Sequence, residues 1–268
     1  MRITIFIIVL CIVLALLMLR LFLLSNRPLI NQDAFFAFNI PSEDVVAIYS
    51  LSNKYDMDFA TILSIYLLDN DFYVLQETPK EQLEQKYFMN FDEAKKRHPR
   101  RLVRKCQVFL RQIFYEIQYF PIRKEHDYVF ENTWGAERTY GGRRTHQGTD
   151  IIATENIPGL IEVISMTDGI VKNIGWNERG GWRVGIETKN GNYYYYAHLH
   201  SYANIQKGDT VAAGQVLGLM GNTGYGPEGT TGEFCVHLHV GIEVIWRGDF
   251  AWINPYPFLR FTEQLREE

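Results

Sequence analysis

The sequence predicts three consecutive parts: an N-terminal membrane-spanning helix, a small α-helical region and an all-β domain of the sandwich or barrel type. Three observations support this fold class. A long apolar run opens the chain, apolar residues then recur at helical spacing, and short β-branched or aromatic runs separated by glycine turns follow. We therefore expect a transmembrane helix at 1–26, a linker and α-helical region at 27–122, and a β-rich domain at 123–268.

The N-terminal run is long enough to cross a membrane. From Ile3 to Leu24 only Thr4 and Arg20 interrupt the apolar residues, and a helix of that length spans about 33 Å, against about 30 Å of hydrocarbon. Residues 25–28 carry no small-residue cleavage pattern, so we predict an uncleaved signal-anchor, with a cleaved signal peptide as the alternative. Arginines flank the run on both sides and do not determine its orientation.

Capping residues mark the beginnings of helices in the second part. Ser42 and Asp58 each precede a segment with helical spacing, and Pro79 and Pro99 stand where further helices should begin. A longer amphipathic helix is expected over 102–117. The role of this region does not follow from its sequence.

Composition excludes several classes of protein. The 268 residues are 47% apolar and can bury a core. The 27 Lys+Arg and 31 Asp+Glu give a net charge of −4, which argues against non-specific nucleic-acid binding. Basic residues gather between 95 and 105, as a solvated helix face or as a contact for anionic lipid or wall polymer.

Cys106 and Cys235 could pair in an oxidising compartment, but two buried free thiols are the better expectation.

The third part has the texture of an all-β fold. Short runs rich in β-branched and aromatic residues alternate with turn signals such as Gly180-Gly181 and Asn190-Gly191. The predicted strands are 161–163, 169–174, 183–188, 192–198, 216–220 and 236–245. Within 193–196 four tyrosines alternate between two faces, one pair in the core and the other free to line a groove.

Histidine and aspartate residues are concentrated in this β domain. His146 and Asp150 lie four residues apart, and His237 and His239 project to the same side of one predicted strand. A catalytic zinc takes three protein ligands and keeps one position open for water, and His and Asp suit that metal. The second histidine of the strand pair and His198 would then stand beside the metal as free imidazoles, an arrangement typical of a hydrolase.

These segments resemble the signatures of a known enzyme family. His146-Gln147-Gly148-Thr149-Asp150, Tyr196-Ala197-His198-Leu199 and His237-Leu238-His239 are similar to the three motifs of the lysostaphin-type, LytM-like zinc endopeptidases. The resemblance spans roughly residues 130 to 260 in the family's order and does not cover the helical region.

The resemblance implies a LytM-like antiparallel β core of the duplicated hybrid motif type, with a narrow groove. It implies that His146, Asp150 and His239 hold Zn²⁺ and that His198 and His237 are catalytic. The substrate would be the peptide stems or cross-bridges of peptidoglycan, and protein partners remain unknown. We therefore expect a zinc metalloendopeptidase in a bacterial cell membrane, single-pass, with the N-terminus inside and the peptidase domain extracytoplasmic.

Two departures from the family pattern stand out. His200 replaces a small polar residue; we interpret it as an exposed strand-end residue, with a substitute metal ligand as the alternative. The segment between Gly224 and His237 is longer than usual and is expected to border the groove, where it would affect substrate preference.

Two other functions compete with the hydrolase. One is a catalytically silent scaffold or wall-binding protein on the same fold, which the presence of all five site residues argues against. The other is a cupin-type metal enzyme that uses His237, His239 and Glu243 to bind iron or manganese. That hypothesis leaves His146, Asp150 and His198 without a role.

Overall fold

A computed structural model describes residues 12–18, 31–246 and 248–265. By its contacts the chain divides into two units, Met1–Asn31 and Gln32–Glu268. In the first unit, residues 12–18 are helical and exposed, and the rest of the predicted 1–26 span lies outside the described residues. Within the described ranges, no helix is both long and apolar enough to cross a membrane.

The predicted helix beginnings are close to the observed ones, but Ser42 does not cap its helix: it is the first residue of α3, whose N-cap is Pro41. Asp58 caps α4 by accepting a bond from the Thr61 N–H at 2.9 Å, and Pro79 and Pro99 immediately precede α5 and α7. The helices are α2 (Gln32–Ala37), α3 (Ser42–Tyr55), α4 (Phe59–Asp69), α5 (Lys80–Leu83), the π-helical η1 (Glu84–Met89), α6 (Phe91–Ala94), α7 (Arg100–Phe114) and α8 (Tyr256–Leu265).

Two expectations from the sequence, one about α7 and one about the cysteines, need correction. The amphipathic helix α7 begins at Arg100 but ends at Phe114, three residues before the predicted end, because the chain turns there toward the sheet. Cys106 on α7 is a buried free thiol as expected, whereas Cys235 is free but exposed, because it lies in a loop rather than in a strand.

The strands form one large antiparallel sheet and a small hairpin. Among the described residues the main path of the sheet runs β1-β4-β11-β8-β7-β6-β9, with β12 beside β11, β10 beside β8 and β5 beside β10; β2 and β3 form the hairpin. The strands are β1 (Tyr128–Phe130), β2 (Glu137–Arg138), β3 (Arg144–Thr145), β4 (Thr149–Ala153), β5 (Glu162–Ile164), β6 (Gly169–Asn177), β7 (Gly181–Glu187), β8 (Tyr193–Tyr202), β9 (Thr210–Val211), β10 (Val216–Met220), β11 (His237–Trp246) and β12 (Asp249–Ile253).

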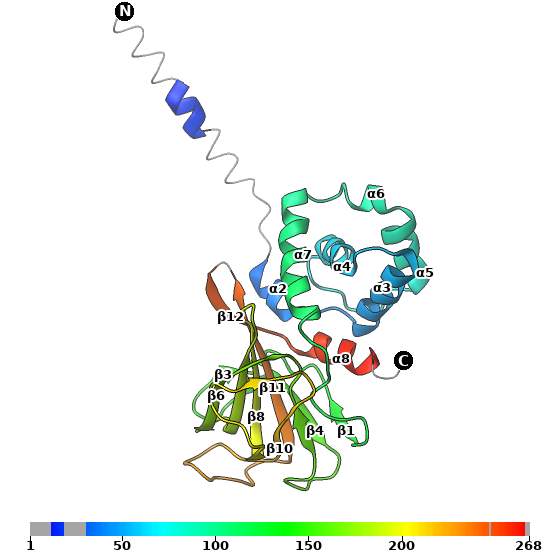
Figure 1. The fold of residues 1–268 in the computed structure, drawn as a ribbon. Helices are drawn as coiled ribbons and strands as arrows, with labels where there is room; N and C mark the ends of the chain where they lie inside the picture. Colours follow the sequence, from blue (N-terminus) through cyan, green and yellow to red (C-terminus); the bar gives the residue numbers. More distant parts are fainter. Residues whose placement is uncertain (1–11, 19–30, 247, 266–268) are drawn as a thin grey trace, which may run out of the picture. The chain divides into compact units, whose positions relative to one another are not determined.

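The helices gather on one side of the unit and the strands on the other, with α2 and α8 at the junction (Figure 1). Aromatic rings pack together at this junction. The ring centroid of Phe35 in α2 lies 4.5 Å from that of Phe109 in α7 and 4.5 Å from that of Trp246 in β11. The buried Asn254 adds a backbone bond to Phe36 O. The helices and the sheet therefore share a core, and the domain boundary at residue 123 stays a prediction.

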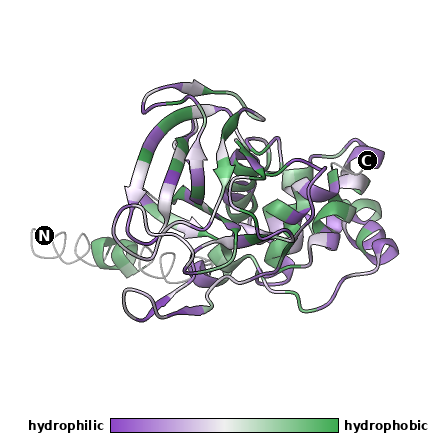
Figure 2. Ribbon diagram, turned by 90° about the horizontal axis from the view of Figure 1, so that it is seen from below, coloured by the Kyte–Doolittle hydropathy of each residue, from purple (hydrophilic) through white to green (hydrophobic). Residues whose placement is uncertain are grey.

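Burial alternates along the first residues of β8 and of β11, and the strand ribbons in Figure 2 carry both hydrophobic and hydrophilic residues. In β8, Tyr194 and Tyr196 are fully buried in the core. Tyr193 and Tyr195 project to the opposite face, the same face as His239 on the neighbouring β11. The tyrosine run thus divides as the alternation predicted, and the second pair lines a groove.

Glu116, just after α7, ties the helices to the hairpin that joins β7 and β8. Its carboxylate accepts bonds from the side chains of Thr188 (2.7 Å), Asn190 (2.7 Å) and Asn192 (2.8 Å). Asn192 is only 2% exposed, so its amide depends on this carboxylate for a partner. The strand that carries Tyr195 and His198 is held in place from this end.

Replacing Glu116 by Ala is expected to lower the free energy of unfolding by about 2–3 kcal/mol, because a buried amide loses a charged acceptor. Denaturant unfolding of the full chain measures the change. Glu125→Ala, at an exposed position, is the matched control and should stay within about 0.5 kcal/mol of the wild type. Equal stability of the two variants would contradict this role for Glu116.

Candidate metal centre and groove

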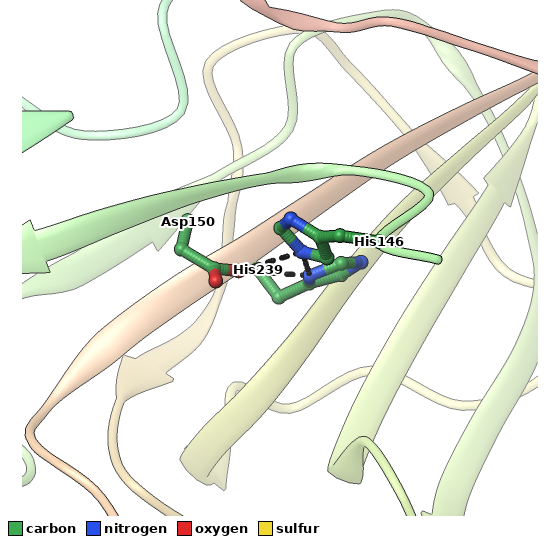
Figure 3. A group of neighbouring side chains, drawn as sticks. All are labelled: His146, Asp150 and His239. Carbon is green, nitrogen blue, oxygen red and sulfur yellow. Dashed lines mark hydrogen bonds and ion pairs between the residues drawn. The ribbon is translucent and has the colours of Figure 1, made fainter. Parts of the chain in front are cut away.

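The pairing of β4 with β11 brings the metal-binding motifs together. In this antiparallel register Asp150 stands directly opposite His239, and His146 lies in the turn that leads into β4. Figure 3 shows the three side chains converging from these two segments. Their ligand atoms all lie within 4.8 Å of one another. Among the described residues, these three form the one group of His, Cys, Asp or Glu side chains that is placed to hold a metal ion.

The geometry of the three ligand atoms fits a small metal ion. Asp150 Oδ1 lies 2.9 Å from His239 Nδ1 and 3.2 Å from His146 Nε2, and the two nitrogens are 3.0 Å apart. Ligand bonds of about 2.0–2.1 Å in a tetrahedron place ligand atoms about 3.3 Å apart. Two imidazole nitrogens and one carboxylate oxygen are donors that zinc accepts.

Residues around the three candidate metal ligands orient their side chains. His146 is 3% exposed, and its Nδ1 lies 3.2 Å from the carbonyl oxygen and 3.0 Å from the hydroxyl of Thr133. Arg138 Nη2 lies 3.1 Å from the same Nδ1 atom, so Nδ1 is engaged on this outer side and Nε2 is turned toward Asp150 and His239. Arg138 donates to the other carboxylate oxygen, Asp150 Oδ2, at 2.8 Å, which leaves Oδ1 for the metal site.

Electrostatics favour an ionised carboxylate at this centre. Burial by itself raises the pKa of Asp150, but the contacts with His146 and His239 outweigh it and hold that pKa well below its usual range. Burial lowers the pKa of His239, against the opposing effect of Asp150. A metal ion would replace the protons that otherwise bridge these groups, because its ligands must be deprotonated.

The remaining two predicted residues lie beside the centre. The ring centroids of His198 and His237 are 4.6 Å apart, and His237 Nε2 lies 3.9 Å from Asp150 Oδ1. His198 Nδ1 faces Thr223 O at 2.7 Å and His237 Nδ1 faces Cys235 O at 2.9 Å. Both rings therefore donate through Nδ1, and each is left with Nε2 as its free nitrogen.

His198 is held in an unusual environment. Its φ of 64° is rare for a residue with a side chain, and its backbone N–H is fixed by Gly180 O at 2.7 Å. Burial first, and then the neighbouring His237 and His239, lower the pKa of His198 well below its usual value. The imidazole is therefore held in its neutral form near neutral pH.

A groove runs from this centre across the outer face of the sheet. Its two hollows share Arg144, Arg179, Tyr195 and His239, and the larger one has a volume of about 790 Å³. The segment between Gly224 and His237 borders the groove, as the sequence predicted. Its Tyr225 lines the metal pocket and stacks on Tyr140 across the rim, with ring centroids 4.2 Å apart.

Two residues raised as alternative ligands lie elsewhere. His200 is exposed and packs beside Gly159, so it stays an exposed residue late in β8 and is not part of the metal group. Glu243 is on β11 opposite Tyr193 and is also not part of that group. The structure therefore gives no support to the cupin hypothesis.

Other contributors to the site were not anticipated from the sequence. Thr133 and Arg138 precede His146 by 13 and 8 residues, in a loop and a two-residue strand with no recognisable pattern. Phe234, whose ring lies 4.6 Å from that of His198, comes from the long loop. A polar and arginine-rich stretch ahead of the first motif was the one available signal for Arg138 and Arg144.

A β-sheet groove that brings a His-Asp-His group together with two further imidazoles is an arrangement typical of mononuclear metal-dependent hydrolases. Residues 144–252 match the profile of peptidase family M23. The chain belongs to this family, as the motif resemblance predicted.

Individual relatives support the same assignment. The chain is 46% identical over 147 residues to an L-Ala–D-Glu endopeptidase of Bacillus subtilis, covering 54% of this chain and 44% of that protein. It is 32% identical over 117 residues to lysostaphin of Staphylococcus simulans, covering 43% of this chain and 21% of that protein. The chain thus spans less than half the length of these curated relatives.

A solved structure extends the likeness to the helices. A crystal structure from Ruminococcus gnavus, named as a glycyl-glycine endopeptidase lytM, is 38% identical with a TM-score of 0.66. The match covers 89% of this chain and 93% of that chain. It therefore includes the helical region, which the motif resemblance did not cover.

Gly148 packs against the centre closely enough to permit a direct test. A Cβ at this position would lie 2.3 Å from His239 Cε1 and 2.7 Å from Val240 O. Gly148→Ala is therefore expected to displace His239 and weaken Zn²⁺ binding at least about tenfold, as measured by chelator competition on the full chain. Glu155→Ala, an exposed change just after β4, should bind as the wild type does. Unchanged affinity in Gly148→Ala would contradict a ligand role for His239.

Proposed function

We propose that this chain is a zinc metalloendopeptidase that hydrolyses peptide bonds of peptidoglycan. The observation that carries the proposal is the convergence of His146, Asp150 and His239 in one groove with two free imidazoles beside them. Family membership supports the proposal. So do the names of two relatives, which are an L-Ala–D-Glu endopeptidase and lysostaphin.

His146 Nε2, Asp150 Oδ1 and His239 Nδ1 would hold the zinc ion. Bound there, zinc supplies Lewis acidity, which lowers the pKa of a water molecule and polarises the scissile carbonyl. Thr133 and Arg138 hold two of these ligands from outside, so that the site keeps its shape when the metal is exchanged.

The chain's own imidazoles move the protons of the reaction. When water adds to the scissile carbonyl, Nε2 of His198 or His237 accepts the released proton, because Nδ1 of each ring is engaged with a backbone carbonyl. The protonated ring then donates to the leaving amine nitrogen as the C–N bond breaks. While it carries the proton, its positive charge stabilises the negative oxygen of the tetrahedral intermediate.

Variants of the metal site and of the free imidazoles separate the two roles. The full chain is expected to bind about one zinc and to release soluble peptides from purified peptidoglycan. Asp150→Ala should lose both the zinc and the cleavage, whereas His237→Ala should keep the zinc and lose about 10²-fold or more in rate. Metal analysis and mass identification of the products measure these outcomes.

The same experiment tests the scaffold alternative. Zinc-loaded wild type that binds cell wall but releases no peptides would favour a catalytically silent protein. Full activity in His239→Ala would rule out the proposed metal site.

We also propose that residues 1–26 anchor the chain in a bacterial membrane, with the N-terminus inside and the peptidase part extracytoplasmic. The support is the apolar run from Ile3 to Leu24 and the location of a wall substrate outside the membrane.

The proposed anchor can be tested in cells. The full chain should fractionate with membranes and be digested by protease added to intact spheroplasts, and removal of 1–26 should abolish membrane fractionation. A chain that added protease reaches only after lysis would contradict the orientation.

A further inference from the structure

The groove beside the metal centre is lined by cationic side chains. Arg144, Arg179 and Arg183 all border its larger hollow, and Glu178 is the one carboxylate that lines this hollow in the described part of the chain. Glu178 is exposed and accepts a bond from the Tyr140 hydroxyl at 3.2 Å. The hollow is therefore positively charged, unlike the chain as a whole.

Of the three arginines, Arg183 has a partly buried guanidinium. It lies on β7 and faces the groove together with Tyr193 and Tyr195 of the adjacent β8. Its Nη1 atom is buried and has no hydrogen-bond partner among the described residues. Burying part of a guanidinium without an acceptor costs free energy. The side chain as a whole is half-buried and lines the groove, so the rest of the guanidinium can meet a ligand's acceptor atoms there.

The arginines are not neutralised by the chain itself. Across the described residues, none of the three takes part in an ion pair. Arg144 makes long contacts of 3.4 Å to Tyr140 O and to the Tyr225 hydroxyl, and Arg179 one of 3.3 Å to Gly141 O. Most of their N–H groups are therefore free for an anionic partner.

The shape and chemistry of the hollow indicate what that partner is. A guanidinium fork matches a carboxylate through two parallel hydrogen bonds, and the tyrosine rings of the floor suit a peptide backbone. The hollow shares His239 and Tyr195 with the metal pocket, so a carboxylate that bound there would belong to a residue close to the scissile bond.

We propose that Arg183, assisted by Arg144 and Arg179, binds a free carboxylate of the substrate next to the scissile bond. The chain then favours acidic stem peptides, such as those that contain an L-Ala–D-Glu bond, over uncharged glycine bridges. This inference rests on the proposed function and specifies the substrate class of the same groove.

Matched peptides test the carboxylate directly. The full zinc-loaded chain is titrated with two L-Ala–D-Glu peptides made uncleavable by N-methylation, one with the free glutamyl carboxylate and one with that group converted to the carboxamide. Cleavage of the unmethylated pair and of pentaglycine is followed in parallel. The wild type is expected to bind the acid peptide about tenfold or more tightly than the amide.

Substitutions then assign the preference to the arginines. Arg183→Gln should bring the acid-to-amide ratio of Kd close to one, with the amide peptide bound as before, and Arg183→Lys should retain part of the preference. Arg179→Gln, at an exposed loop position, should reduce the ratio even if the β7 variant folds poorly. Arg143→Gln is the control, because Arg143 is exposed and paired with Glu137, and it should leave the ratio unchanged.

The outcomes separate the inference from the proposed function. Equal affinity of the wild type for the acid and amide peptides, or an unchanged ratio in both Arg183→Gln and Arg179→Gln, would overturn the carboxylate site. Cleavage of both peptides at equal rates would overturn it while leaving the endopeptidase intact. Selective binding of the acid peptide with no cleavage of any peptide would support the site and defeat the proposed function.

Discussion

The antiparallel register between β4 and β11 is the constraint on which the rest of the site depends. It sets Asp150 opposite His239, two residues whose sequence positions are 89 apart, and the turn before β4 adds His146. Because strand pairing alternates faces, a slip of one residue would turn the metal ligands into the core. Gly148 allows the His239 ring to lie against the β4 turn, since any side chain there would collide with it.

Backbone carbonyl groups orient the three imidazole rings of His146, His198 and His237. The carbonyls of Thr133, Thr223 and Cys235 each face one imidazole nitrogen, and each thereby selects the nitrogen that remains for chemistry. Nε2 of His146 is thereby turned toward Asp150 and His239, and Nε2 of His198 and of His237 remains for the proton transfers that we propose. The proposed hydrolase site thus combines oriented metal ligands with two imidazoles whose Nε2 atoms can serve in proton transfer.

The sequence predicted the parts of the site that depend on local spacing. The interval from His146 to Asp150, the alternation in His237-Leu238-His239 and the division of the tyrosine run all follow from strand periodicity, and the structure places these side chains accordingly. The helix beginnings after Asp58, Pro79 and Pro99 followed from capping chemistry in the same way.

Features that depend on distant contacts did not follow from the sequence. Arg138 reaches Asp150 through the β2–β3 hairpin, and the aromatic contacts of Phe35 join helices to the sheet across some 200 residues of chain. The charge of the groove was hidden because Arg144 and Arg183 come from different strands and the net charge of the chain is negative. The exposure of Cys235 likewise depends on a loop conformation rather than on residue type.

A zinc-soaked crystal of the full chain, with anomalous diffraction measured on both sides of the zinc edge, tests the central claim most directly. We expect one strong zinc peak bound by His146 Nε2, an Asp150 carboxylate oxygen and His239 Nδ1, with His198 and His237 outside the coordination sphere. A zinc ion held instead by His198 or His237, or no zinc between these three ligands, would contradict it.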